Sequence, residues 1–544
     1  STVSGTYDVT ATTGDITDSG NLIITGAATF ITTAAGRNII LDQSGNVFTS
    51  TVTMQAGNGS NAAFDDITFV DSAAVRLHSS AASAGDLYIN ASTDGAVGGD
   101  LSITATTGNI TQGAAVVVTG TTTLKATTSN DITLDNTSNN FQGAVKITSG
   151  NDVTLVDAGD IDLGASTVSG TYAVTATSGD ITDSGTLTIT GASIFTTRVG
   201  GSNIVLDSSA NAFAAAVTMK ADTGGDETFG NITFVDSAAV KLHSSAGTNG
   251  DLFIDAGTDL AVGGNLSITA TTGNITQGSE VAVGGTTTLV TSANDATITL
   301  NDADNAFTGA LTITTNDNSG TDADVIIDGG TTALIIAAST IDGDLTLTSG
   351  ATAGITDSGT VTVLGDIYLI TDAGNGVIDM GTLAVTGSVD LATHGSGDAT
   401  LVNATALDFA ASTVGGELTA TATTGDITQS GSLDINGTGT TTITASASGA
   451  DITLFNAAND FEGAVSTTGH DVKLWTADTM NLGAATIAGD YTVYAGTTID
   501  DSGAQVITGD ATFKTHAASS QITFDHVGND FDGDFITVGG IGYL

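Results

Sequence analysis

The residues best suited to bind a ligand are aspartates that alternate near the C-terminal end of the chain. Asp530, Asp532 and Asp534 fall on one face of a strand-like segment, with Gly533 between the last two. Successive side chains of a strand point to opposite faces, so every second residue shares a face. Hard carboxylate oxygens at this spacing suit Ca²⁺. These three aspartates therefore form one candidate calcium site.

A second acidic segment offers a looser, loop-like version of the same chemistry. Its candidate calcium ligands are Asp322 and Asp324, preceded by Asn316 and Asn318. Neither segment matches a complete EF-hand loop, which supplies its ligands at fixed positions around an invariant glycine. A solvated acidic face is the alternative interpretation of both segments. We expect no bound cofactor unless calcium occupies one of them.

Residues for catalysis are not apparent in the sequence. No Ser-His-Asp arrangement, phosphate-binding loop or zinc motif is recognisable, and the 9 lysines and arginines are scattered singly. Some polysaccharide-degrading enzymes have the parallel β-helical fold that the repeats of this chain predict. Those enzymes need paired carboxylates or an activated base in a cleft. A near-identical repeat distributes its features evenly, whereas a catalytic site departs from the repeat. We therefore expect that the protein is not an enzyme.

Long internal repeats determine how these residues are positioned. Residues 1–26 and 166–191 differ at only 4 positions, and the phrase ITFVDSAAV recurs at the same offset of 165 residues. The sequence thus divides into a first super-repeat at 1–165, a second at 166–330 and divergent repeats at 331–544.

A shorter phrase, N-x-F, marks one position of the repeating unit. The structural interpretation is that its phenylalanines fill the interior near a corner, while the preceding asparagine bonds the backbone of the turn. Exposed phenylalanines that stack on a ligand are the alternative. Spacings within the repeats predict a coil of about 20–24 residues, within the range of solenoid repeats. The phenylalanines are Phe48, Phe141, Phe213, Phe307, Phe461 and Phe531.

The hydrophobic pattern between turns has the period of a β-strand. Segments such as TYDVTAT and DITFVD alternate apolar and polar residues, and glycine, asparagine and aspartate separate them. The chain contains no proline, which fits strands that are paired on both edges. Short strands that recur in every coil predict an all-β fold, a right-handed parallel β-helix (β-solenoid) in which each coil stacks on the next.

The charge balance restricts the partners of the protein. Its 59 acidic residues against 9 lysines and arginines give a formal net charge of −50. Such a surface cannot displace counterions from phosphates, so we expect no nucleic-acid partner. No run of about 18 apolar residues exists, so we expect no membrane insertion. The few sites for trypsin-like proteases suit a secreted protein that is extracellular or displayed at the cell surface.

Two basic phrases occupy matching positions in the two super-repeats. His78 and His243 follow Arg76 and Lys241 at a distance of two residues. Strand alternation places Arg76 and His78 on one face, opposite Leu77, so we expect the histidines to be exposed to solvent. A metal site here would need further ligands from adjacent coils.

The repeats resemble those of a known group of proteins. GDITDSGTLTITG, NDFEGAV and DVTLVDAGDIDLGASTVSG are similar to the β-strand repeats of large bacterial surface proteins, the filamentous-haemagglutinin-like adhesins. The resemblance covers essentially the whole chain. It implies a right-handed parallel β-helix, surface display and a role in adhesion, biofilm or fibre formation, and it carries no catalytic motif.

These observations predict a structural extracellular β-solenoid rod that forms a bacterial surface fibre or filament. We expect its subunits to stack head to tail as a homopolymer, because an open coil exposes a strand edge with which another copy can pair. The alternative is an adhesin stalk that binds glycans or host and cell-surface receptors. That alternative needs exposed aromatic patches, for which Trp475, 7 tyrosines and a few phenylalanines are available.

Overall fold

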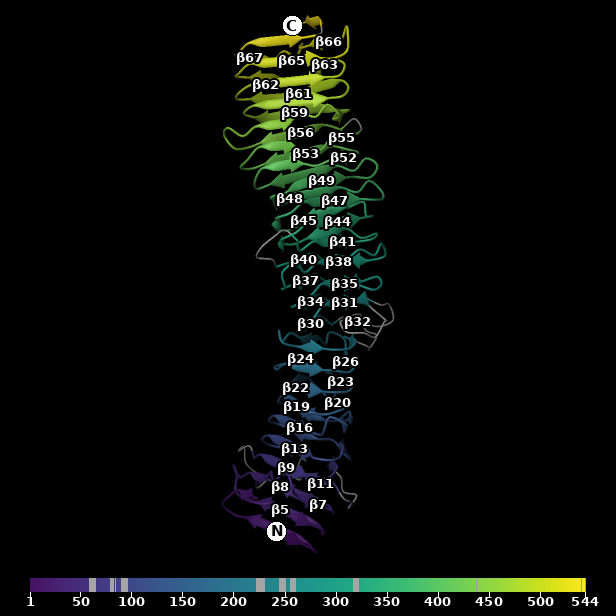
Figure 1. Cartoon of the computed structure of the whole chain (residues 1–544), viewed down its shortest axis with the longest axis vertical. Helices are drawn as coiled ribbons and strands as arrows, with labels where there is room; N and C mark the ends of the chain where they lie inside the picture. The colour runs from purple at the N-terminus through teal and green to yellow at the C-terminus, as the bar shows by residue number, and fades with distance from the viewer. Residues whose placement is uncertain are drawn as a thin grey trace. The chain divides into compact units, whose positions relative to one another are not determined.

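The chain is an all-β solenoid of about 22 turns, shown in Figure 1 as a computed structural model. Within the described residues there is no helix, and the strands are two to eight residues long. The predicted all-β class and the parallel β-solenoid are confirmed. The structure describes residues 1–57, 65–78, 83, 85–89, 96–221, 230–243, 251–254, 261–316, 322–436, 439–539 and 541–543.

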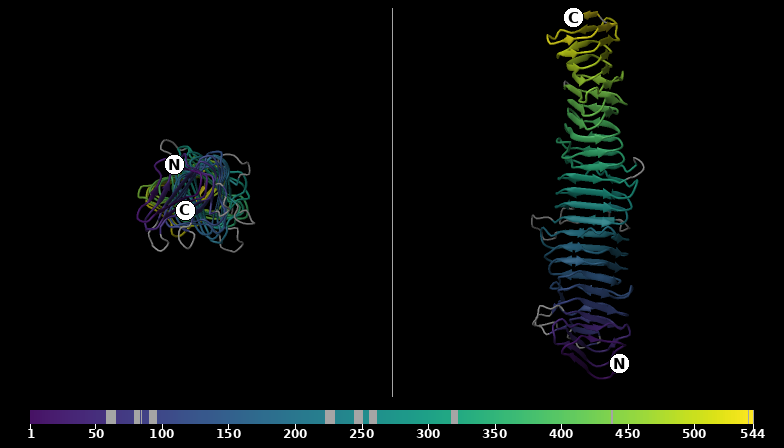
Figure 2. Two further views of the ribbon diagram at one scale, coloured as in Figure 1. Left: turned by 90° about the horizontal axis from the view of Figure 1, so that it is seen from below. Right: turned by 90° about the vertical axis from the view of Figure 1, so that its left-hand side faces the viewer.

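Contacts group the chain into two compact units, Ser1–Thr271 and Thr272–Leu544. Within each unit the strands of neighbouring turns pair in parallel, so each turn is a coil stacked on the one before it (Figure 2). The boundary between the units does not follow the super-repeats at 1–165 and 166–330, which stay a division of the sequence. No described segment is a helix with the length and hydropathy to cross a membrane.

In the first unit two long sheets share the coils. One sheet starts with β2 (Tyr7–Ala11), β5 (Ala28–Thr32) and β8 (Val52–Gln55). Later strands of that sheet are β17 (Ile132–Leu134), β20 (Val153–Asp157), β23 (Tyr172–Ala176) and β26 (Ser193–Thr197). The other sheet contains β9 (Ile67–Asp71), β13 (Leu101–Ala105) and β16 (Thr122–Lys125). A short third face is made by strands such as β22 (Ser166–Val168), β25 (Leu187–Ile189) and β28 (Ala212–Phe213).

The second unit has the same two-sheet arrangement. The strands of one sheet that matter below are β57 (Ile452–Leu454), β60 (Val472–Thr476), β62 (Tyr491–Ala495), β65 (Ala511–Thr515) and β68 (Phe535–Val538). Strands of the other sheet beside them are β56 (Thr441–Ala445), β59 (Ala464–Gly469) and β61 (Met480–Ile487). Hydrogen bonds between adjacent coils join residues from 16 to 35 positions apart, so insertions lengthen some coils beyond the predicted 24 residues.

Alternation along each strand builds the core. In β62, Tyr491, Val493 and Ala495 are fully buried, whereas Thr492 and Tyr494 face outward. Threonine and β-branched residues suit such a pleated, half-buried surface. The interior of both units is therefore a column of valine, isoleucine, leucine and phenylalanine with polar side chains outside.

The N-x-F phrase forms a buried corner, as predicted. Phe141 and Phe461 are 2% exposed, and Asn139 and Asn459 are fully buried. The Oδ1 of Asn459 accepts the N–H of Leu433 at 2.9 Å, and its Nδ2 donates to the carbonyls of Leu454 and Trp475 at 3.3 and 3.1 Å. One amide thus satisfies backbone groups of three coils, which would otherwise be buried without partners. Phe531 is the exception among the six phenylalanines because it is only half-buried.

Candidate functional site

A row of aspartates runs along one corner of the second unit. Each precedes a strand of the same sheet, and its Oδ1 accepts the backbone N–H of the next aspartate at 2.8–2.9 Å. Parallel strands are about 4.8 Å apart, so the carboxylates stack at that interval. We call this feature the aspartate row: Asp426, Asp451, Asp471, Asp490, Asp510 and Asp534.

The first predicted calcium segment ends in this row. Asp530 lies in β67 (Asp530–Phe531), which belongs to one sheet, whereas Asp534 precedes β68 in the other sheet. The chain turns a corner at Gly533, where a Cβ would lie 2.3 Å from the carbonyl oxygen of the coil below. Asp530, Asp532 and Asp534 therefore do not share one strand face, and calcium binding by them stays a prediction.

The second predicted segment lies at an equivalent corner earlier in the unit. The Oδ1 of Asp324 accepts the N–H of Asp344 at 2.9 Å, and the N–H of Asp324 is bonded to the carbonyl of Asp322. The amide of Asn316 donates to the carbonyl of Ser292, and Asn318 lies outside the described residues. One oxygen of Asp324 is thus committed to the backbone, and calcium binding by Asp322 and Asp324 stays a prediction.

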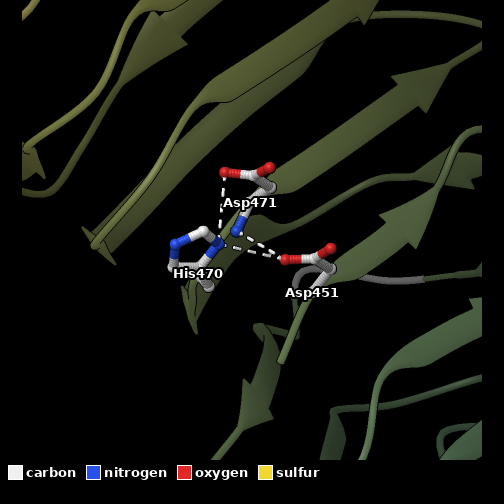
Figure 3. Close-up of side chains that lie close together, drawn as sticks. All are labelled: Asp451, His470 and Asp471. Atoms are coloured by element: carbon white, nitrogen blue, oxygen red, sulfur yellow. Dashed lines mark hydrogen bonds and ion pairs between the residues drawn. The ribbon is translucent and has the colours of Figure 1, made fainter. Parts of the chain in front are cut away.

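One group in the described part of the chain has three ligand atoms within 4.8 Å of one another: Asp451, His470 and Asp471 (Figure 3). The Nδ1 of His470 lies 3.3 Å from the Oδ1 of Asp451 and 3.3 Å from the Oδ1 of Asp471. The three side chains are 42–44% exposed. One nitrogen and two carboxylates are a donor set that zinc accepts.

The repeat explains this group without a metal. Residues 131–156 and 451–475 align along DITL, N-x-F-x-G-A-V and D-V-x-L, and Asn151 occupies the position of His470. The Nδ2 of Asn151 donates to the Oδ1 of Asp131 at 2.9 Å, just as His470 contacts Asp451. The histidine therefore replaces a structural asparagine of the corner, and the carboxylate oxygens that it meets also accept backbone N–H groups.

Beside the aspartate row the outward face of the same sheet carries a cluster of aromatic rings. We call Phe455, Trp475, Tyr494 and His516 the aromatic cluster. Ring centroids lie 5.1 Å apart for Phe455 and Trp475, 4.8 Å for Phe455 and Tyr494, and 5.6 Å for Trp475 and Tyr494. His516 stacks on Trp475 at 5.3 Å with the planes 9° apart. The first three rings are half-buried, and His516 is exposed.

Strand register brings the cluster together. Trp475 in β60 pairs with Tyr494 in β62, and Tyr494 pairs with Lys514 in β65. The ammonium of Lys514 lies 5.1 Å from the centroid of the Tyr494 ring, within the range of a cation–π contact. Lys473 projects from the same face, two residues before Trp475. Aromatic, basic and acidic side chains thus meet on one surface.

A hollow of about 310 Å³ borders the cluster at Phe455. Gln429, Thr453 and Asn456 supply polar groups to its lining. A second hollow, of about 320 Å³, adjoins His470 on the other side of the aspartate row. Both hollows are shallow and open to solvent, and the first lies directly beside the rings.

The aromatic cluster was not predicted from the sequence. Its successive members are 19 to 22 residues apart, so the exact coil register is needed to see that they meet. The available signal was a departure from the repeat. Where the first unit has Asp135, Val156 and Thr175, the aligned positions of the second unit hold Phe455, Trp475 and Tyr494.

The predicted solvent exposure of the paired histidines is wrong. His78 is half-buried and His243 is 5% exposed, because both end their strands with a left-handed backbone, φ 51° and 50°. Because of this conformation, His78 does not continue the strand alternation that places Arg76 on the outward face. Burial lowers the pKa of His78. Arg76 is partly exposed and its Nε donates to the Oδ1 of Asp86 at 2.9 Å.

The stacked coils and repeated corners define a β-solenoid repeat protein. The chain belongs to the family of repeats of unknown function (DUF5649), whose model matches residues 1–55, 65–148, 150–220, 229–314, 396–468 and 469–538. No curated protein and no solved structure shows significant similarity to the chain.

Proposed function

We propose that the protein is a non-enzymatic structural scaffold of the cell surface or the extracellular space. The observation that carries this proposal is the parallel pairing of neighbouring coils within each unit, supported by buried asparagines at N-x-F corners such as Asn139 and Asn459. Such a body is stiffened along its stacking axis by every ladder hydrogen bond. The acidic composition and the scarcity of trypsin sites support an extracellular location.

In its finer form the proposal is a filament of the filamentous-haemagglutinin-like type, in which subunits stack head to tail. A parallel ladder supports this because any stack of coils presents a strand edge that another copy can extend. A heterologous contact of this kind does not close and therefore gives fibres.

Electron microscopy of the purified chain, with sedimentation velocity over a range of concentrations, tests the filament. Fibres that lengthen with protein concentration are expected, and particles of one fixed length at all concentrations would contradict head-to-tail stacking. The same grids with a calcium chelator test the acidic segments. Loss of fibres that Asp530→Asn and Asp532→Asn reproduce would support calcium ligands there.

A second candidate function, adhesion to glycans, is favoured by the aromatic cluster. Trp475 and Tyr494 are half-buried on an outward sheet face, where the aligned coils of the first unit carry Val156 and Thr175. Rigid amphipathic rings are the side chains that contribute most to recognition surfaces. Staining of glycan-bearing cells by the labelled chain, lost on addition of soluble glycan, tests this candidate.

A further inference from the structure

The surface around the aromatic cluster consists of three parallel columns of side chains. Asp471, just before β60, is followed at every second residue by Lys473 and Trp475 in the strand, and all three face outward. The corresponding residues of the next coil include Asp490, just before β62, and Tyr494 within it. The sheet therefore presents a column of carboxylates, a column of threonine and lysine, and a column of aromatic rings side by side.

The backbone of this surface is not available to a partner. Strand β62 pairs with β60 on one edge and with β65 on the other, residue by residue. A peptide cannot add a strand here, because β-augmentation needs an unpaired edge. Recognition must therefore use side chains alone.

The side chains combine three properties that restrict the class of ligand. Trp475 and Tyr494 offer apolar ring faces, Lys473 and Lys514 donate hydrogen bonds, and the outer oxygens of the aspartate row accept them. A sugar ring has a flat face of C–H groups surrounded by hydroxyls that both donate and accept. An apolar helix would leave the flanking charges without partners, and that is unfavourable on a desolvated surface.

Charge selects among glycans. Asp451, Asp471, Asp490 and Asp510 stand in line beside the rings, within a chain of net charge −50. A sulfated or carboxylated glycan would meet like charges at this row, as would the phosphates of nucleic acid. The electrostatics therefore favour a glycan without charge.

We propose that the aromatic cluster, with Lys473 and the adjoining aspartates, is a binding surface for a neutral glycan. This proposal rests on the second candidate function and assigns it to residues. Trp475 and Tyr494 stack against sugar rings, and Lys473 with Asp471 and Asp490 bonds hydroxyls. The hollow beside Phe455 holds a substituent or a neighbouring sugar.

The chain provides its own reporter and its own conservative variants. Trp475 is the only tryptophan, so its fluorescence reports on this surface alone. The full chain is titrated with cellohexaose, maltohexaose, mannohexaose and chitohexaose, with oligogalacturonate as the anionic comparison, by fluorescence and calorimetry. Tyr494→Thr and Trp475→Val install the residues that the first unit carries at the aligned positions, Thr175 and Val156. Circular dichroism verifies that they fold.

We expect at least one neutral hexasaccharide to bind, and each variant to weaken that binding by about tenfold or more, the effect of losing one well-packed aromatic contact. Tyr368→Thr is the matched control, because Tyr368 faces outward on β47 (Ile367–Thr371) away from the cluster. It should leave binding unchanged.

The other outcomes separate this proposal from the functions on which it builds. A glycan that binds the chain equally well after Tyr494→Thr and Trp475→Val would overturn the assigned surface and leave adhesion standing. No response to any neutral glycan would overturn both the surface and glycan adhesion. The scaffold function is measured by microscopy and does not depend on either result.

Discussion

The coils β17 to β26 in the first unit and β57 to β65 in the second unit are built on one plan. Both have the buried N-x-F corner, the same strand register and carboxylates stacked at one corner. They differ on the outward face, where Val156 and Thr175 of the first region correspond to Trp475 and Tyr494 of the second. Residues that point inward are constrained by packing, so differences that serve a partner accumulate outside.

The largest expected effect tests what the two regions share. Asn139→Leu and Asn459→Leu each remove a side-chain amide that accepts one hydrogen bond from a buried backbone N–H and donates two to backbone carbonyls. Unsatisfied buried groups make each change destabilising by about 3 kcal/mol or more. Hydrogen exchange should show lost protection at Val116 in the first variant and at Leu433 in the second. Unequal losses would show that the corners are not equivalent.

A second comparison concerns pH. The first unit buries aspartates at a corner where the second region has Thr476, and burial raises the pKa of Asp71 and Asp236 to about 6. The folded state then holds a proton that the unfolded chain releases near 3.8, so stability falls as pH rises from about 4 to 6.

At neutral pH, each of these aspartates lowers the free energy of unfolding by up to about 3 kcal/mol relative to its value below pH 4. Asp71→Asn keeps an acceptor for the N–H groups of Phe48 and Ala73. Hydrogen exchange of β9 in this variant should be more protected at pH 7 than in the unmodified chain and no longer change between pH 4 and 6. Strand β60, which has Thr476, should lack this dependence in both proteins. A pH response of β9 that survives Asp71→Asn would contradict the assignment.

Transfer of the aromatic residues to the first unit tests whether the outward side chains alone account for glycan binding by the second unit. The double variant Val156→Trp, Thr175→Tyr places a Trp–Tyr pair in matching register on the first unit. We expect a change in stability of about 1 kcal/mol, typical of one aromatic pair. In a Trp475→Val background its fluorescence should respond to the glycan that binds the second unit. A folded variant without that response would show that Phe455 or the lysines are also required.

The smallest effect concerns the contact shown in Figure 3. His470→Asn restores the residue of the first region, and Asn151 already bonds Asp131 in this way. Exposed contacts of this kind contribute less than about 1 kcal/mol, so thermal unfolding should be nearly unchanged. Zinc that raises the melting temperature of the unmodified chain but not that of His470→Asn would instead reveal a metal site.

The sequence was sufficient for the features that recur many times along the chain. Alternation and N-x-F spacing predicted parallel strands, the buried Phe141 and Phe461, and asparagines bonded to the turn. These are local or recur many times, so one error in placing a strand does not remove the pattern.

The candidate site depended on register, which the sequence did not define closely enough. A shift of one residue moves a strand's side chains to the other face. A coil length of about 20–24 residues therefore could not align Phe455, Trp475 and Tyr494. The same limitation affected Asp530 and Asp534, because a corner at Gly533 leaves Asp530 in β67 of one sheet and Asp534 just before β68 of the other. His78 and His243 were misplaced for another reason, since nothing in their phrase signals a left-handed backbone.

The aspartate row also gives the second unit the character of a short polyelectrolyte. Its carboxylates are about 4.8 Å apart, closer than the distance of about 7 Å at which two unit charges in water interact with the thermal energy. Small cations should accumulate along such a line of charge without being coordinated at any one residue. A change in fibre formation with calcium or ionic strength would then report the linear charge density of the row. Magnesium would produce the same change at the same concentration.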